Sequence, residues 1–266
     1  MPDLAMIMFV GILLASLAVW VMVLERLVSS ISLIPLAVPT TRPRPMLAII
    51  LVFTSVFLSC SSLFLPKQSS PAIDDLVKVL DNTLFVMATQ VMTCCVLLVC
   101  LTRLGSQRLT RFGIDGRHPT RDIGIGLLGY FAAAIPVFLF NFAMEPFRTL
   151  DNQHFFLRIL RGESSVPLAV LVIVSALVLA PLSEELIYRV IFQGTLQRHV
   201  TPTASIVISA TVFSAVHGFP DAIGLFPLAM ILGFLYWRTG SYLTVVTTHA
   251  VFNGVSVLLT ILSLEG

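Results

Sequence analysis

The chain has 266 residues, of which 57% are hydrophobic and 11% are charged, and its mean hydropathy is +0.97. A soluble domain carries about 25% charged residues, so this composition excludes an ordinary soluble domain and predicts an integral membrane protein. The net charge of +2 is too small to suggest nucleic-acid binding. We therefore expect the lipid bilayer, and no nucleic acid, among the partners of the chain.

Eight apolar runs predict an all-α, polytopic membrane protein with about eight transmembrane helices. A run of about 20 apolar residues crosses the hydrocarbon core as a helix, because no other open structure satisfies its backbone there. The sixth and seventh runs are short, so we expect neighbouring helices to cover them. The predicted spans are Leu4–Leu24, Met46–Leu65, Thr83–Thr102, Ile123–Phe142, Val166–Phe192, Thr203–His217, Ala222–Tyr236 and Tyr242–Leu262.

Arginine clusters in alternate loops, and this alternation predicts the orientation of the chain. Arginine collects on the cytoplasmic side of membrane proteins, and eight spans then place both the N-terminus and the C-terminus outside. The cluster after the third span would also suit anionic lipid headgroups. The loop at 143–165 does not fit, because it holds Arg148, Arg158 and Arg161 with three acidic residues. The arginines predicted to be cytoplasmic are Arg26, Arg42, Arg44, Arg103, Arg108, Arg111, Arg117, Arg121, Arg198 and Arg238.

Costly polar residues inside the predicted spans collect in the second half of the chain. Charged groups within a membrane span face the interior of the bundle and usually serve function. The first four spans contain almost no ionisable residue away from their ends. The candidate site residues are Glu184, Glu185, Arg189, His217, His249 and Asn253.

The spacing of these residues predicts which of them share a helix face. Glu185 and Arg189 are four apart and can form an ion pair, and His249 and Asn253 are also four apart. Glu184 points about 100° away from Glu185, which leaves it free for another role.

The lengths of the helices predict that the polar groups lie at one depth. Glu184 lies 14 residues before Arg198 and His217 lies 14 residues after Thr203, so both lie roughly 21 Å from the intervening turn. His249 and Asn253 lie roughly 13 and 19 Å along the last span. We therefore expect Glu184, His217, His249 and Asn253 to meet in one polar pocket.

Such a pocket suits hydrolysis of an acyl bond within the membrane. A buried glutamate and a nearby histidine can share a proton, take one from water and later deliver one to a leaving amine. A second histidine with an asparagine can donate hydrogen bonds to the oxyanion. Structural roles remain open, because a single histidine or asparagine in a span is often an interhelical hydrogen-bonding group. Glu184, His217 and His249 could alternatively bind zinc, although the chain has no H-E-x-x-H motif.

Three motifs in order resemble the CPBP family. These are Glu184-Glu185-x-x-x-Arg189, Phe213-x-x-x-His217 and His249-x-x-x-Asn253. This family comprises the Rce1-type CAAX-processing proteases and the bacterial Abi proteins linked to bacteriocin immunity. One departure is Val190, where many members have glycine after the motif arginine.

The resemblance implies a helical intramembrane endopeptidase that acts on a peptide or protein at the membrane. By position, Glu184 and His217 match the pair that activates water, His249 and Asn253 match the oxyanion donors, and Glu185 and Arg189 match the supporting part of the first motif. The family has been described both as metalloproteases and as metal-independent glutamate proteases. The spacing favours the second description, so we expect no required cofactor.

The resemblance also predicts how the chain is organised and where it acts. We expect N-terminal transmembrane helices with an Arg-rich cytoplasmic loop in residues 1–121 and a CPBP-like protease domain in residues 122–262. The expected location is the plasma (inner) membrane of a bacterium. The alternative functions are a non-catalytic scaffold or immunity protein and a proton-coupled carrier. A carrier is disfavoured because the chain shows no internal repeat.

Overall fold

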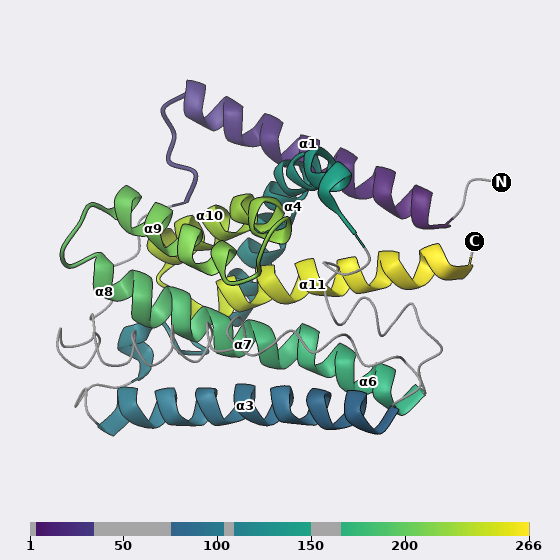
Figure 1. Ribbon diagram of the computed structural model, residues 1–266. Helices are drawn as coiled ribbons and strands as arrows, with labels where there is room; N and C mark the ends of the chain where they lie inside the picture. The colour runs from purple at the N-terminus through teal and green to yellow at the C-terminus, as the bar shows by residue number, and fades with distance from the viewer. Residues whose placement is uncertain (1–3, 35–75, 104–108, 150–165, 266) are drawn as a thin grey trace.

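The computed structural model describes residues 4–34, 76–103, 109–149 and 166–265, and these residues form a helical bundle (Figure 1). The long helices are α1 (Leu4–Val28), α3 (Leu76–Arg103), α4 (Pro119–Met144), α10 (Asp221–Thr239) and α11 (Tyr242–Glu265). The short helix α9 spans Pro202–Ala215, and the 3-10 turns η1 and η2 span Leu109–Phe112 and Glu145–Phe147. One continuous helical rod runs from Val166 to Leu196 through α6 (Val166–Val174), the π-helical turn η4 (Ser175–Leu179), α7 (Ala180–Glu185), the π-helical stretch η5 (Leu186–Gln193) and α8 (Gly194–Leu196).

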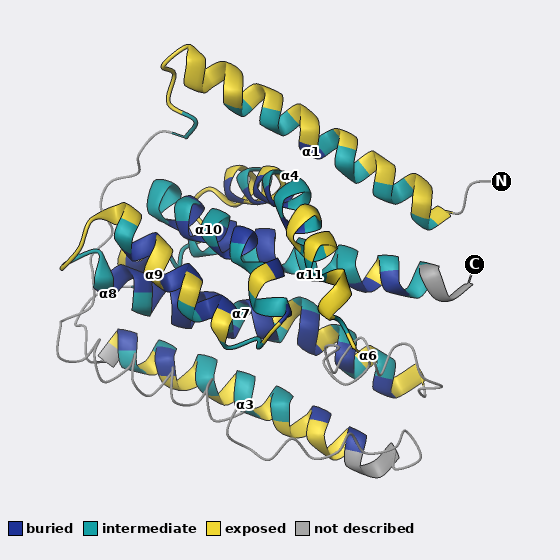
Figure 2. Cartoon of the chain, turned by 45° about the horizontal axis from the view of Figure 1, so that its top comes forward, coloured by how far each residue is buried: buried dark blue, intermediate teal, exposed yellow. Residues whose placement is uncertain are grey.

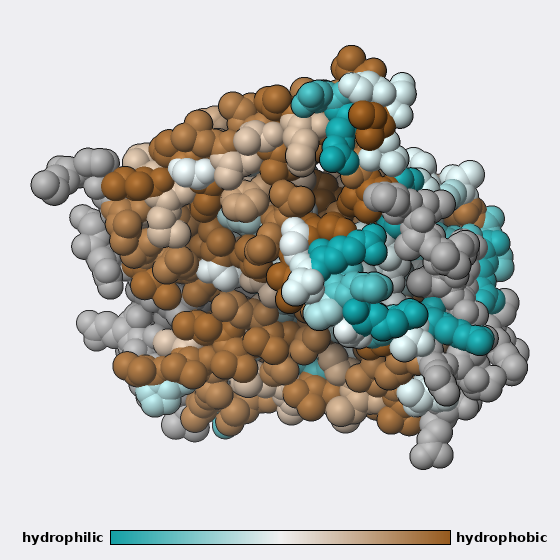
Figure 3. All heavy atoms as spheres, turned by 180° about the vertical axis from the view of Figure 1, so that it is seen from behind, coloured by the Kyte–Doolittle hydropathy of each residue, from teal (hydrophilic) through white to brown (hydrophobic). Residues whose placement is uncertain are grey.

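The described helices confirm a polytopic, all-α membrane protein. Six of them are long and apolar enough to cross a bilayer, and α9 is a shorter apolar helix. Seven of the eight predicted spans coincide with helices, whereas Met46–Leu65 lies outside the described residues. The rear face is largely apolar, and hydrophilic side chains gather towards one end of it (Figure 3). The N-terminus and the C-terminus lie at the same end of the bundle (Figure 1).

Burial is concentrated in the second half of the chain. Figure 2 shows buried residues along α7, α9 and α10, whereas α1 and α3 are mostly exposed. The 14 residues of α9 span only about 21 Å, and α9 packs against α10 and η5. The neighbours of this short helix therefore cover it, as expected from the sequence.

A proline explains how α1 is attached to α4. Pro136 lies inside α4 and has no backbone N–H, so the carbonyl of Ala132 loses its helical donor. The indole Nε1 of Trp20 donates to this carbonyl at 3.0 Å, and Ser16 Oγ accepts from the N–H of Ile135 at 3.1 Å. The N-terminal helix thus satisfies the backbone groups at the proline, which bilayer lipid could not do.

Glycines allow α4 to pack closely against α11, the helix that carries His249 and Asn253. A Cβ atom at Gly126 would lie 2.8 Å from the carbonyl oxygen of Thr244. Thr248 Oγ donates to the carbonyl of Gly126 at 2.8 Å, and Ser241 Oγ donates to Asp122 at 2.9 Å. Small residues that permit close approach and side-chain hydrogen bonds are typical of helix association in membranes.

We expect Gly126→Ala to destabilise the bundle by about 1–3 kcal/mol, because the added methyl group overlaps backbone as well as side-chain atoms of α11. The measurement is thermal unfolding of the purified protein in detergent. Gly124→Ala is the matched control, since a Cβ atom at Gly124 would meet nothing within 4 Å. Equal melting temperatures for the two variants would contradict this account of the interface.

Candidate functional site

A buried ion pair lies at the centre of the rod formed by residues 166–196. Glu185 ends α7 and Arg189 lies one turn later in η5, and both side chains are fully buried. Arg189 Nε donates to Glu185 Oε2 at 2.9 Å, as the spacing of the two residues predicted. Each charge is neutralised by the other, which a charged pair away from water requires.

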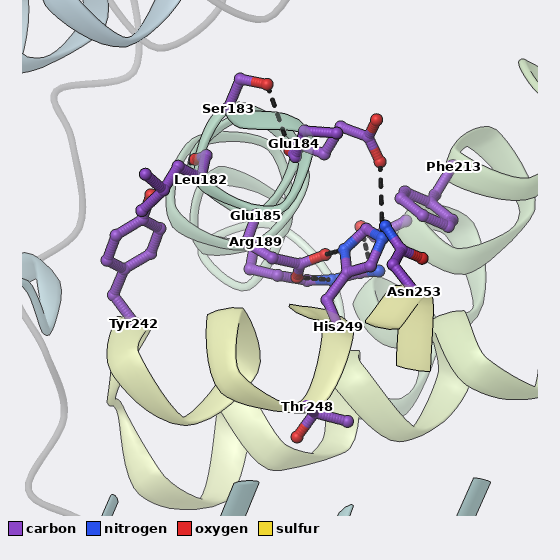
Figure 4. Close-up of polar contacts among 12 residues, drawn as sticks. Leu182, Ser183, Glu184, Glu185, Arg189, Phe213, Tyr242, Thr248, His249 and Asn253 are labelled. Atoms are coloured by element: carbon purple, nitrogen blue, oxygen red, sulfur yellow. Dashed lines mark hydrogen bonds and ion pairs between the residues drawn. The ribbon is translucent and has the colours of Figure 1, made fainter. Parts of the chain in front are cut away.

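His249 of α11 lies between the two adjacent glutamates (Figure 4). Its Nδ1 lies 2.8 Å from Glu185 Oε1, and its Nε2 lies 3.9 Å from Glu184 Oε2. Because an ionised carboxylate only accepts hydrogen bonds, Nδ1 is the ring nitrogen that donates to Glu185. This bond orients the ring and turns Nε2 towards Glu184, whose side chain is 27% exposed.

Asn253 is held by a carbonyl group that a proline leaves free. In η4 the N–H of Ala180 donates to the carbonyl of Ser175. The next donor in this π-helical pattern would be Pro181, which has no N–H. The carbonyl of Ala176 accepts instead from Asn253 Nδ2 at 2.8 Å. Asn253 therefore connects α11 to the rod one turn away from His249.

His217 follows the end of α9 and is partly buried. Its Nδ1 lies 2.8 Å from the carbonyl oxygen of Phe213, so Nδ1 carries the proton and Nε2 keeps its lone pair when the ring is neutral. The ring of Phe213 lies 4.8 Å from the ring of His217 and 5.8 Å from that of His249. Both histidine rings therefore contact the same aromatic ring.

Ser209 of α9 is a further residue of the site, which the sequence motifs do not include. Its hydroxyl donates to the carbonyl of Tyr188 at 2.9 Å and accepts from Arg189 Nη1 at 3.3 Å. The guanidinium of Arg189 also lies 5.0 Å from the centre of the Phe213 ring, a cation–π contact. Ser209 and Phe213 are four residues apart, so they lie on one face of α9, and His217 follows four residues later, just beyond the end of this helix.

The structure brings together most, but not all, of the predicted contacts. Glu184 lies beside His249, Glu185 pairs with Arg189, and Asn253 lies near His249 (Figure 4). No ion pair joins Glu184 to His217 among the described residues. Glu184 lies next to His249, and the ring of Phe213 lies between His249 and His217.

Glu184, His217 and His249 are the side chains that the sequence offers for a zinc site. Both ring nitrogens of His249 are directed at carboxylates, and His217 Nδ1 is directed at a carbonyl group. Within the described ranges, no three His, Cys, Asp or Glu side chains lie close enough together to hold an ion. The Nδ1 atoms of both histidines are already engaged, so an ion at this site would have to be bound through the Nε2 atoms.

A cavity of about 360 Å³ lies beside α7 and is not lined by the candidate site. Its walls include Leu182 and Tyr242, and the hydroxyl of Tyr242 donates to the carbonyl of Leu182 at 2.5 Å. Figure 4 shows these two residues on the opposite side of α7 from the Glu184 carboxylate. Tyr242 therefore fastens the start of α11 to the turn that precedes Glu184.

The arrangement can support acid–base chemistry in a site that is largely closed to water. It contains the partly exposed carboxylate of Glu184, two imidazoles of defined orientation and the amide of Asn253. The buried ion pair of Glu185 and Arg189 lies next to these groups. Groups of this kind transfer protons and stabilise a developing negative charge.

Comparison with known proteins agrees with the sequence motifs. Residues 166–255 match the model of the Rce1-like family, which is described as type II CAAX prenyl endopeptidase Rce1-like. No curated protein and no solved structure matches the chain. The resemblance to the CPBP family is confirmed over this segment, which contains all six candidate residues. The match supports a CAAX-type intramembrane peptidase in general terms.

Proposed function

We propose that this chain, whose residues 166–255 are Rce1-like, is an intramembrane endopeptidase. Its proposed catalytic residues are Glu184, His217, His249 and Asn253. The observation that carries the proposal is the placing of His249. Its Nδ1 is bound to the buried Glu185, and its Nε2 faces Glu184 at 3.9 Å. The first contact fixes the orientation of the ring, and the second brings a partly exposed carboxylate beside the other ring nitrogen.

In the proposed reaction, Glu184 and His217 activate the attacking water. Glu184 is the more accessible of the two adjacent glutamates, and Glu185 is already engaged by Arg189 and His249. The hydrogen bond from His217 Nδ1 to the carbonyl of Phe213 leaves Nε2 as a base. A water between the two groups gives up a proton, and its oxygen attacks the carbonyl carbon of the peptide.

His249 and Asn253 would donate hydrogen bonds to the resulting oxyanion. Protonated Nε2 of His249 is a donor, and the carboxylate of Glu185 stabilises that imidazolium. Asn253 Nδ2 carries two protons, and one of them forms the hydrogen bond to the Ala176 carbonyl. The remaining proton points away from this carbonyl and is available to the oxyanion.

The tetrahedral intermediate then collapses. The carbon–nitrogen bond breaks, and the proton taken from water passes from the Glu184/His217 pair to the leaving amine. The products are a carboxylic acid and an amine, which ionise to a carboxylate and an ammonium group, so water is the one co-reactant and no oxidant is needed.

We further propose a peptide or protein substrate at the membrane and a metal-independent mechanism. The matched family is described as type II CAAX prenyl endopeptidase Rce1-like, so prenylated CAAX peptides are the first substrates to assay. The predicted cytoplasmic location of the Arg-rich loops favours substrate entry from that side.

Purified wild type and His217→Ala test this proposal on a panel of prenylated and unprenylated peptides, with and without a strong chelator. We expect wild-type cleavage to persist with chelator and His217→Ala to lower kcat by about 10²–10⁴-fold, because a general base is lost. Loss of wild-type cleavage with chelator would favour the zinc mechanism. No cleavage of any peptide by folded wild type would favour the scaffold.

A further inference from the structure

Arg148 belongs to the loop whose charges do not fit the predicted alternation, and its contacts show another use for its charge. Nη1 of Arg148 lies 2.7 Å from Oδ1 of Asp221, and Nη2 donates to Oδ1 of Asn141 at 2.7 Å. The side chains of Arg148 and Asp221 are only 22% and 16% exposed. A pair so little exposed is screened less than one at the surface.

Asp221 begins α10 and follows His217 by four residues. The turn between them contains Gly218, whose φ of +74° strongly favours glycine. The backbone N–H of Ala222 donates to the carbonyl of Gly218 at 2.7 Å, so the turn and the start of α10 form one unit. His217 lies on this unit, beyond the last residue of α9.

Two further contacts fasten this turn to the end of α4. The rings of Phe147 and Phe219 meet edge to face with centroids 5.5 Å apart. A Cβ atom at Gly224 would lie 2.3 Å from Oδ1 of Asn141, so a side chain at this position would displace the amide that also binds Arg148. We call this set, Asn141, Phe147, Arg148, Phe219 and Asp221, the α4 clamp.

We propose that Arg148 is a positioning residue, which holds the His217 turn in place through Asp221. The role in catalysis rests on the proposed function, because it requires His217 to act on water. Arg148 lies outside the matched segment 166–255, so this part of the site comes from another region of the chain. A base held on a turn, rather than inside a helix, needs such an external attachment to keep its geometry.

The test compares Arg148→Gln with Arg117→Gln in the purified full-length protein. Arg117 pairs with Asp115 at the other end of α4, and its hydrogen bond holds the pKa of Asp115 below the ordinary value. The control therefore also breaks an ion pair beside α4. We expect Arg148→Gln to lower kcat by roughly 10–100-fold with little change in KM, because misplacement by about 1 Å has effects of that size. Arg117→Gln should leave both constants unchanged.

Hydrogen exchange supplies a readout that does not depend on activity. In Arg148→Gln, amides of residues 216–224 should exchange faster, whereas those of residues 239–243, in the turn at the opposite end of α10, should not. Arg148→Lys and the exchanged pair Arg148→Asp/Asp221→Arg should each restore part of the lost kcat and of the protection.

Faster exchange with unchanged kcat would show a purely structural role and overturn the positioning role. Unchanged exchange at residues 216–224 would overturn the clamp itself. If Glu184→Gln also leaves cleavage unchanged, the proposed function fails, and the exchange data alone then decide whether Arg148 holds the turn.

Discussion

Replacing Glu184 by glutamine is expected to lower kcat by about 10²–10⁴-fold, the contribution of a positioned general base. Glutamine has nearly the same shape as glutamate but cannot accept a proton from water. The loss should appear in kcat rather than in KM, because binding of the peptide does not require the base. The measurement is steady-state cleavage of a peptide that wild type cleaves.

Glu25→Gln provides the control for this experiment. Glu25 is an exposed glutamate near the end of α1, so the variant removes a carboxylate without touching the site. Its kcat should equal that of wild type. Undiminished cleavage by Glu184→Gln would falsify the assignment of Glu184 as the base.

Replacing Glu185 by glutamine is expected to lower the free energy of unfolding by about 3–5 kcal/mol, because it leaves the buried Arg189 charge without its counter-ion. Nη2 of Arg189 is already buried and has no hydrogen-bond partner among the described residues, so the guanidinium has little there to replace the carboxylate. Cleavage should fall as well, because His249 loses an ionised acceptor. Reversible unfolding in detergent measures the first effect.

Two variants sharpen this experiment. Asp115→Asn removes a carboxylate whose partner Arg117 has a 70% exposed side chain, so the arginine left behind stays in water and stability should change much less. The double variant Glu185→Gln/Arg189→Met removes both charges and should recover part of the stability lost in Glu185→Gln. If Glu185→Gln and Asp115→Asn lower the free energy of unfolding by the same amount, the buried ion pair does not stabilise the site.

The motifs of the site could be read from the sequence because charge is costly in a bilayer. Glu184, Glu185 and Arg189 stand out in an apolar run, and their spacing predicted the ion pair that the structure contains. Ser209 could not stand out in this way, since a serine in a span is common and inexpensive. Its contact with Arg189 depends on how α9 packs against η5.

The partners of His249 could not be derived from spacing. The 100° separation of adjacent residues predicted that Glu184 and Glu185 would act apart, yet one imidazole reaches towards both carboxylates. Both glutamates lie in α7, so the α-helical angle between them holds, and it is the packing of α11 against α7 that places the ring within reach of both side chains. The hydrogen bond of Asn253 to Ala176 depends likewise on the π-helical turn before Pro181.

The amino-acid sequence alone indicated that the chain spans a membrane, where its described helices begin and end to within several residues, and which side chains are candidates for the site. Those features follow from local hydrophobicity and from the cost of burying charge. Tertiary structure decided which of these side chains meet. It also explains Arg148, which does not fit the charge pattern of the loops and forms an ion pair with Asp221. Contacts between distant segments depend on helix packing and on backbone groups freed by prolines, and neither is encoded within a single span.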